Sequence, residues 1–226
     1  MQASARSKLW GLVARRHPSA FLLAAQLLSL LLYPLMDQGH SGRLLFGAVS
    51  LVVIPLAVWV ISRSPSITRI GWILAIPAML LTVVGVVFEI PALLPWAALL
   101  EAGVYFYAAT GLISYMLHDH RVTADELFAA GATFTLLAWG FAYAYFVCQA
   151  WYPGSFTAFE PERPRTWMEL LFFSFTNLSA TGLCDVLPVS APARVLTMLE
   201  QFAGVGYIAT VVSRLIGLTI VRHERG

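Results

Sequence analysis

The sequence predicts an all-α membrane protein. Of its 226 residues, 59% are hydrophobic and 12% are charged, whereas about a quarter of the residues of a soluble protein carry charge. Long apolar segments recur along the chain, but one apolar segment, 166–178, is short and runs into small and polar residues. A helix needs about 20 residues to cross the hydrocarbon of a bilayer. We therefore expect several spanning helices and one re-entrant segment.

Residues 1–19 form a basic N-terminal segment, in which Arg and Lys alternate with apolar side chains. Two interpretations are open: a short helix in the lipid headgroup region, or a solvated tail. The apolar run that follows has no cleavage pattern of small residues, so we do not expect a removable signal peptide.

Six spanning helices are expected in all. Prolines mark several of their ends, because the residue before a proline is disfavoured in a helix. The six predicted ranges are 21–36, 43–61, 70–90, 96–117, 124–151 and 192–221. The first four helices make a peripheral domain, 20–118. The range 96–117 contains no Lys or Arg, so we expect no conventional voltage sensor, which needs several charges in the membrane field.

The re-entrant helix is predicted to start at Thr166. Thr166 followed by Glu169 is the pattern of a capping box, and the segment 179–185 follows the helix. Non-helical backbone at membrane depth is tolerated only where it is buried in protein or lines a watery path. We therefore expect 179–185 to line such a path.

The orientation is predicted from the basic residues near the helix ends. Most of them fall on the side of the N-terminus, and loops rich in Lys and Arg stay in the cytoplasm. We expect a multi-pass protein of the cell (inner) membrane with both termini cytoplasmic and the re-entrant loop opening outward.

Residues 172–185 carry a family resemblance. They read Phe-Phe-Ser-Phe-Thr-Asn-Leu-Ser-Ala-Thr-Gly-Leu-Cys-Asp, which resembles the pore helix and selectivity filter of the potassium channel family, whose filter reads Thr-Val-Gly-Tyr-Gly-Asp. The bacterial six-helix members look similar from 124 to the end, including Pro153-Gly154-Ser155-Phe156 and Leu187-Pro188-Val189. The resemblance implies a pore domain, 124–222, made of an outer helix, a pore helix, a filter and an inner helix. It also implies a homotetramer that passes K⁺ (or Na⁺) passively.

The filter positions depart from the family pattern at three residues. Ala180 stands where the family has threonine, so a hydroxyl is lost unless Ser179 or Thr181 replaces it. Leu183 replaces the tyrosine and cannot form its hydrogen bond. Cys184 replaces the second glycine, where a non-glycine residue would be strained by about 1–3 kcal/mol.

Two filter residues keep the family pattern. Gly182 retains the first glycine, which adopts positive φ without steric cost. Asp185 follows the filter, and four copies would form a ring of carboxylates that attracts cations. A capping or hydrogen-bonding role behind the filter is the alternative for Asp185.

The last spanning helix carries a predicted hinge and gate. Gly204 and Gly206 would bend it as the resemblance implies, or would allow close helix packing. Ile208, Val212 and Ile216 recur at helical spacing. They would form an apolar constriction that closes by dewetting, or a plain packing stripe.

Other ionisable or reactive residues give weaker signals. Glu101 is an intramembrane acid or a side chain that reaches the nearby interface, and Glu89 ends the third helix. We expect His118 to His120 and Asp125-Glu126 to lie in a solvated loop, with a pH or metal response as the alternative. Cys148 and Cys184 are expected to be free thiols rather than a bridge, because sequence alone does not establish their geometry.

The function that this pattern predicts is a potassium-channel-like cation channel. The departures in the filter leave two alternatives open, a weakly selective cation channel and a non-conducting membrane scaffold or regulatory subunit. The sequence offers no residues for catalysis, so we expect no enzyme, no cofactor and no metal besides the permeant cation. The expected partners are other copies of the chain, membrane lipids and monovalent cations, and no nucleic acid.

Overall fold

A computed structural model describes residues 17–32, 51–60, 65–118, 123–160, 163–214 and 216. These residues form helices apart from short loops and one pair of two-residue strands. The elements are α2 (Pro18–Leu32), the helix Leu51–Val60, α4 (Pro65–Val87), η2 (Pro91–Leu93), α5 (Leu94–His118), α6 (Ala124–Trp151), β1 (Phe156–Thr157), α7 (Trp167–Leu178), β2 (Leu187–Pro188), α8 (Ala191–Tyr207) and the π-helical turn η3 (Ile208–Val212).

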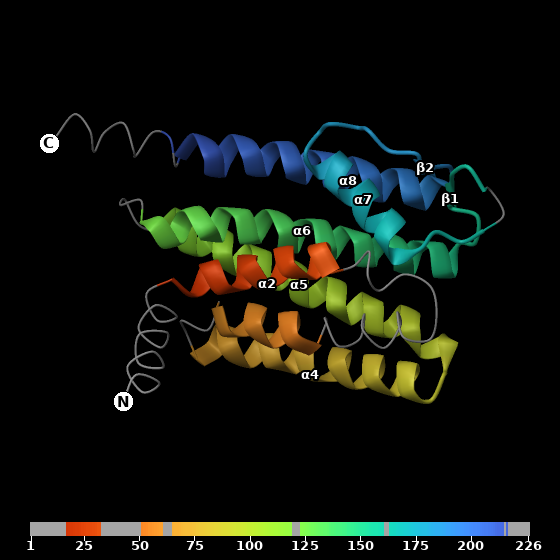
Figure 1. Ribbon diagram of the computed structural model, residues 1–226, viewed down its shortest axis with the longest axis horizontal. Helices are drawn as coiled ribbons and strands as arrows, with labels where there is room; N and C mark the ends of the chain where they lie inside the picture. The colour runs from red at the N-terminus through yellow and green to blue at the C-terminus, as the bar shows by residue number, and fades with distance from the viewer. Residues whose placement is uncertain are drawn as a thin grey trace, which may run out of the picture.

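Helix α6 lies at the centre of the bundle. It packs against α5 and α2 on one side and against α7 and α8 on the other, and α4 covers the far side of α5 (Figure 1). The largest fully buried side chains include Trp139 and Tyr145 of α6 and Tyr105 of α5. Helix α8 contacts the bundle through both α6 and α7.

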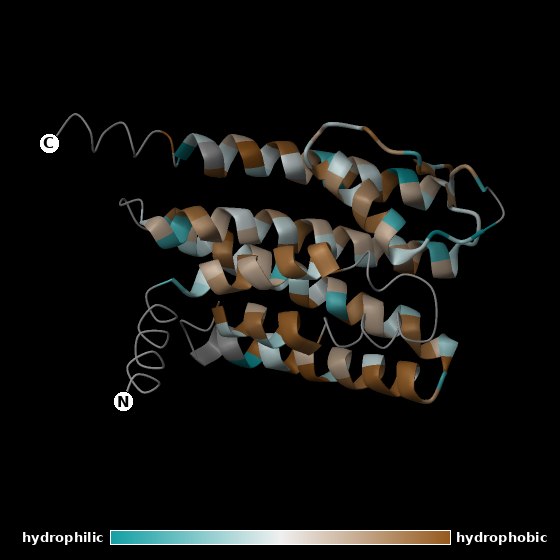
Figure 2. Ribbon diagram, in the orientation of Figure 1, coloured by the Kyte–Doolittle hydropathy of each residue, from teal (hydrophilic) through white to brown (hydrophobic). Residues whose placement is uncertain are grey.

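Three of the described helices are long and apolar enough to cross a membrane: Arg69–Val87, Pro91–His118 and Ala124–Trp151. The helices Pro18–Leu32 and Leu51–Val60 are apolar but shorter. Hydrophobic residues run along most of α4, whereas hydrophilic ones gather near β1 and β2 (Figure 2). The chain is a helical membrane protein, and parts of the predicted helices over 21–36, 43–61 and 192–221 lie outside the described residues, as does 1–16.

The helix ends agree with the prediction for α6 and differ from it for α2 and α4. The predicted bounds of α6 are confirmed, with the Thr123 side chain accepting from the Glu126 amide at 3.3 Å. Helix α2 starts three residues earlier than predicted, at Pro18, because proline suits the first helical position. Helix α4 ends at Val87 instead of 90, because Glu89 turns the chain with φ +51°.

The strands β1 and β2 tie the end of α6 to the start of α8. Phe156 pairs with Pro188 and Thr157 with Leu187 in antiparallel register, and the Val189 amide donates to the Ser155 carbonyl at 2.9 Å. As predicted, α6 ends before Pro153, and Gly154 turns the chain with φ +76°. Both ends of the segment 158–186 are thus fixed at the same end of the bundle.

Helix α8 does not continue as a regular α-helix. The Ser190 hydroxyl caps its start by accepting from the Ala193 amide at 3.3 Å. After Tyr207 the chain forms the π-helical turn η3 before α-helix resumes at 213–214. A π-turn is a local widening of the helix and is frequent at functional sites, and the pattern of apolar residues did not predict it.

Candidate functional site

Helix α7 starts with the predicted capping box. The Thr166 side chain accepts from the Glu169 amide at 3.3 Å, and the Glu169 carboxylate accepts from the Thr166 amide at 2.6 Å. Arg163 donates two hydrogen bonds to the same carboxylate, at 2.7 and 3.1 Å. This contact with Glu169 raises the pKa of Arg163 above its ordinary value. The start of α7 is therefore fixed by both side chains and backbone.

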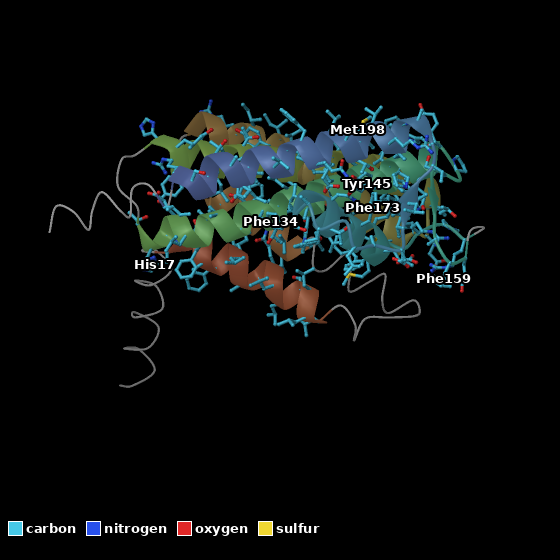
Figure 3. All side chains as sticks on the ribbon, turned by 90° about the horizontal axis from the view of Figure 1, so that it is seen from above. His17, Phe134, Tyr145, Phe159, Phe173 and Met198 are labelled. Carbon is cyan, nitrogen blue, oxygen red and sulfur yellow. The ribbon has the colours of Figure 1, made fainter. Side chains whose placement is uncertain are left out.

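Aromatic side chains hold the body of α7 against α6. Phe173 and Tyr145 lie side by side (Figure 3), with their ring centroids 5.0 Å apart. The ring of Phe156 in β1 lies 5.8 Å from that of Phe173. Nearer the end of α7, the rings of Phe175 and Phe134 lie 5.8 Å apart. Helix α7 thus has one buried face against α6, and its last residues lie next to α8.

After α7 the backbone folds back on the helix. The amides of Thr181 and Gly182 both donate to the Thr176 carbonyl, at 3.0 and 3.1 Å, and the Ala180 amide donates to the Asn177 carbonyl at 3.0 Å. Since these N–H groups point toward α7, the carbonyl groups of the segment are left for other partners. Within the part of the chain that the structure describes, four carbonyl oxygens of 179–183 accept no hydrogen bond, those of Ser179, Ala180, Thr181 and Leu183.

Positive φ angles occur at alternate residues of this segment. Gly182 has φ +65°, as predicted, and Ala180 has φ +58°. The strain predicted for Cys184 is wrong, because among the described non-glycine residues only Glu89 and Ala180 have positive φ. Instead, the Cys184 amide donates to the Gly182 carbonyl at 3.1 Å and its sulfur accepts from the Val186 amide at 3.5 Å. The non-glycine strain in the segment therefore lies at Ala180.

Two hydroxyl groups lie close to the position where the family has its threonine. The Ser179 and Thr181 hydroxyl oxygens are 3.0 Å apart, and each lies within hydrogen-bonding distance of the Thr176 carbonyl, at 3.4 and 3.3 Å. Their protons are therefore used inside the loop, and their lone pairs remain available as acceptors.

The residues after Gly182 are more exposed. Leu183 is 78% exposed. Asp185 is also exposed, and the Cys184 sulfur lies 3.7 Å from one of its carboxylate oxygens. Cys184 and Cys148 are both free, as predicted. The structure thus brings all the predicted residues from Ser179 to Asp185 into one loop at the end of α7.

Glu200 is a buried acid that the sequence analysis does not single out. It lies in the middle of α8 with 0% exposure. One of its carboxyl oxygens accepts from the Tyr145 hydroxyl of α6, and the other is hydrogen-bonded to the Ser174 hydroxyl of α7. The signal was present in the sequence, since an acid inside a spanning helix suggests function by default. That rule was applied to Glu101 and Glu89 but not to Glu200.

Gly204 brings α8 into close contact with α7. A Cβ atom on Gly204 would lie 2.1 Å from the carbonyl oxygen of Leu178 and 2.9 Å from its Cα, whereas a Cβ on Gly206 would meet nothing within 4 Å. One turn away, the Gln201 side chain donates to Asn177 at 3.0 Å. Of the two interpretations of Gly204, close packing is the one that this geometry favours.

The predicted gate residues lie at the end of α8. Ile208 and Ile216 are exposed, and the side chain of Val212 lies outside the described part of the chain. Ile208 and Val212 bound the π-turn η3, which changes the angular spacing assumed for a regular helix. The gate stays a prediction.

At the end of the bundle opposite the strands, Asp125 and Glu126 are buried, so the predicted solvated loop is wrong for these two residues. Asp125 accepts from the Ser19 amide and hydroxyl, both at 3.1 Å, and Arg214 pairs with Glu126 at 3.3 Å. The reason is that α2 and the end of the last helix pack over the start of α6. His118 ends α5, and Asp119 and His120 lie outside the described residues.

The two acids predicted for the third and fourth helices have different surroundings. Glu101 is buried and accepts from the Thr82 hydroxyl of α4 at 2.6 Å, so the interpretation as a side chain reaching the interface is wrong. Glu89 lies in the exposed turn after α4. Glu101 therefore joins α4 to α5 instead of facing solvent.

The comparisons with known proteins concern the part of the chain that contains this loop. Residues 131–220 match a family model described as ion channel, a range that starts in α6 and includes α7, the loop and α8. The searches of curated proteins and of solved structures gave no match. The match supports channel-like ion transport by a membrane protein, and it points to a transport rather than a catalytic function.

Proposed function

We propose that the chain is one subunit of a tetrameric potassium-channel-like pore that passes monovalent cations passively, with Ser179 to Asp185 as its filter. The observation that carries this proposal is that four carbonyl oxygens after α7, those of Ser179, Ala180, Thr181 and Leu183, accept no hydrogen bond within the described chain. Carbonyl oxygens in such a filter replace the hydration shell of a cation.

The electrostatics of the loop also favour a cation. The C-terminal end of a helix carries a partial negative charge, and α7 ends at Leu178, directly before the loop. The exposed carboxylate of Asp185 adds a negative group on the other side of the filter residues. An anion would meet unfavourable charge at both places.

A symmetric pore needs several copies, because one chain supplies one loop. Helix α8 offers a face for assembly, since its apolar side chains recur at helical spacing and are exposed in the single chain: Val195, Met198, Leu199, Phe202 and Val205. Aromatic and methionine side chains such as Phe202 and Met198 are enriched in interfaces between subunits. We propose that the pore domain 124–222 uses this face to form a homotetramer.

The wider arrangement belongs to the same proposal. Six spanning helices would divide into the peripheral domain 20–118, without a conventional voltage sensor, and the pore domain. Both termini would lie in the cytoplasm and the filter would face outward across the cell (inner) membrane. The supporting feature is the distribution of basic residues near the helix ends.

Weakly selective cation conduction is the second candidate. Ala180 supplies no hydroxyl to the filter, and the protons of the Ser179 and Thr181 hydroxyls are used in hydrogen bonds to each other and to the Thr176 carbonyl. The exposed side chain of Leu183 makes no polar bond that would hold the filter diameter. Both features favour looser ion coordination than in a filter with threonine and tyrosine.

Ion efflux from proteoliposomes tests the proposal. Vesicles loaded with K⁺ and containing the full-length protein should release K⁺ faster than empty vesicles. Gly182→Ala should slow the efflux, because alanine is disfavoured at φ +65°. Gly154→Ala is the matched control, because Gly154 has φ +76° and equally open surroundings outside the loop. Efflux equal to that of empty vesicles, or equal losses in both variants, would count against the filter.

A further inference from the structure

Glu200 is a buried carboxyl group without a basic partner. It has 0% exposure, and none of the ion pairs among the described residues includes it. A buried unpaired carboxylate is energetically costly, and such groups usually take up a proton instead. The hydrogen bonds around Glu200 give independent evidence of its protonation state, because each bond needs one proton.

Three oxygen atoms are linked by two successive hydrogen bonds where α6, α7 and α8 meet. The Ser174 hydroxyl oxygen is 2.7 Å from the Ala138 carbonyl oxygen and is hydrogen-bonded to one carboxyl oxygen of Glu200. Two hydrogen bonds in a row need two protons. A hydroxyl has one proton and a carbonyl oxygen has none, so the second proton must be on Glu200.

The other carboxyl oxygen of Glu200 is bonded to the Tyr145 hydroxyl. Tyr145 donates its proton there, so this oxygen is an acceptor. A neutral carboxylic acid, with one donor and one acceptor oxygen, satisfies every polar group in the cluster. If Glu200 were ionised, its carboxyl oxygen and the Ala138 carbonyl oxygen would both have to accept the single proton of the Ser174 hydroxyl.

We propose that Glu200 is a neutral carboxylic acid that donates to Ser174, and that this bond positions α7 and the filter loop on the inner helix. Ser174 lies less than one helical turn before Thr176, whose carbonyl accepts from the amides of Thr181 and Gly182. A shift of α7 relative to α8 therefore moves the filter backbone. The role in positioning a filter rests on the proposed function, whereas the protonation state does not.

Few ionisable groups face Glu200. Helix α6 contributes Tyr145, with Cys148 one turn further on, and α7 contributes the non-titrating Ser174. On α8 itself, Thr197 lies one turn away and donates to the Ala193 carbonyl at 2.9 Å. None of these groups carries a positive charge that would stabilise an ionised Glu200.

Variants of Glu200 distinguish two possibilities, a neutral acid that acts through its hydrogen bonds and a carboxylate whose negative charge is required. Glu200→Gln keeps one donor and one acceptor, so K⁺ efflux should stay close to wild type. Glu200→Ala and Ser174→Ala should each cause a loss of efflux, because each leaves buried polar groups without their hydrogen-bond partners. Thr133→Val is the control, because the buried Thr133 hydroxyl donates within its own helix, to the Ala129 carbonyl at 2.7 Å. If Glu200→Gln is as damaging as Glu200→Ala, the proposal fails.

Infrared spectroscopy of the purified full-length protein tests the protonation state without relying on ion flux. Wild type at neutral pH should show a carboxylic-acid C=O band that Glu200→Gln removes and Ser174→Ala shifts. Absence of this band from the difference spectrum would overturn the proposal. If the wild type does not conduct, the channel function fails, and the infrared band still decides the state of Glu200. Thermal unfolding of the Gln and Ala variants then replaces efflux as the second measurement.

Discussion

Ala180 and Gly182 share a left-handed backbone conformation, although only one of them is glycine. An L-residue in this region costs about 1–2 kcal/mol, whereas glycine adopts it freely. The N–H groups of 180–182 nevertheless all bond to carbonyls at the end of α7, and these bonds require the chain to turn at both positions. Three hydrogen bonds therefore outweigh the strain at Ala180.

Exchanging the residue types at these two positions should have opposite effects. Gly182→Ala should lower the free energy of unfolding by about 1–2 kcal/mol. Ala180→Gly should leave it unchanged or raise it, because it removes the strain at φ +58°. Thermal unfolding in detergent checks both variants, and a larger loss for Ala180→Gly than for Gly182→Ala would contradict this backbone geometry.

The glycines of α8 give a second residue-scale prediction. Gly204→Ala places a methyl group against the Leu178 backbone, and overpacking of this kind costs about 1–3 kcal/mol. Gly206→Ala should be neutral or stabilise the helix by up to about 1 kcal/mol. The unfolding temperatures of the two variants provide the measurement. Equal effects would favour a hinge at both positions over close packing at Gly204.

Single residues were predicted from the sequence where a local rule applies to them. Gly182 was predicted because its conformation follows from its lack of a Cβ atom. The backbone strain at Cys184 was predicted wrongly, because it was taken from a filter sequence with a second glycine, and Cys184 does not have positive φ here. The burial of Asp125 and Glu126 was missed because it depends on α2 and Arg214, which are distant in sequence.

At the scale of elements, α7 is a short helix that depends on its N-terminal cap. Partial burial raises the pKa of the Glu169 carboxyl, but hydrogen bonds from Thr166 and Arg163 outweigh it, so the pKa lies below the ordinary value. A lowered pKa means that the ionised form stabilises the folded state. Its contribution is complete above the ordinary glutamate pKa and is lost as the pH falls through the lowered value.

Removal of the cap should therefore have a pH-dependent effect. Thr166→Ala should lower the free energy of unfolding by about 0.5–2 kcal/mol. Glu169→Gln should destabilise the protein at neutral pH and lose this effect in acid, where wild-type Glu169 is protonated too. Unfolding temperatures of wild type and Glu169→Gln measured across the acidic range check the sign. A difference that grows as the pH falls would contradict it.

The starts and ends of elements were predictable where capping residues or prolines mark them. The bounds of α6 and the capping box of α7 are confirmed for this reason. The π-turn η3 was not predictable, because the apolar residues around it fit a regular helix equally well.

At the scale of the whole molecule, the exposed apolar face of α8 is the proposed subunit contact. Phe202 is 82% exposed on this face, and aromatic side chains are enriched in interfaces between subunits. Membrane character was predictable from composition and from the length of the apolar segments. Three of the described helices are long enough to span a membrane, and the count of six stays a prediction. The assembly also stays a prediction, because it depends on contacts between chains.

Assembly can be tested with two matched substitutions. Phe202→Glu should weaken the tetramer, because it places a charge in the proposed subunit contact. Phe159→Glu should have no effect, because Phe159 is 96% exposed in the loop after β1, away from α8 (Figure 3). Native mass spectrometry in detergent measures the oligomer. A wild-type monomer, or equal assembly of both variants, would contradict the proposed contact.

The most direct test of the filter is single-channel recording of the purified protein in planar bilayers with a KCl gradient. A cation filter at Ser179 to Asp185 predicts unitary currents that reverse near the K⁺ equilibrium potential. With Na⁺ replacing K⁺ on one side, the shift in reversal then distinguishes a selective filter from a weakly selective one. Currents that reverse near the Cl⁻ equilibrium potential, or no unitary currents in either wild type or Leu183→Tyr/Cys184→Gly, would contradict the proposed function.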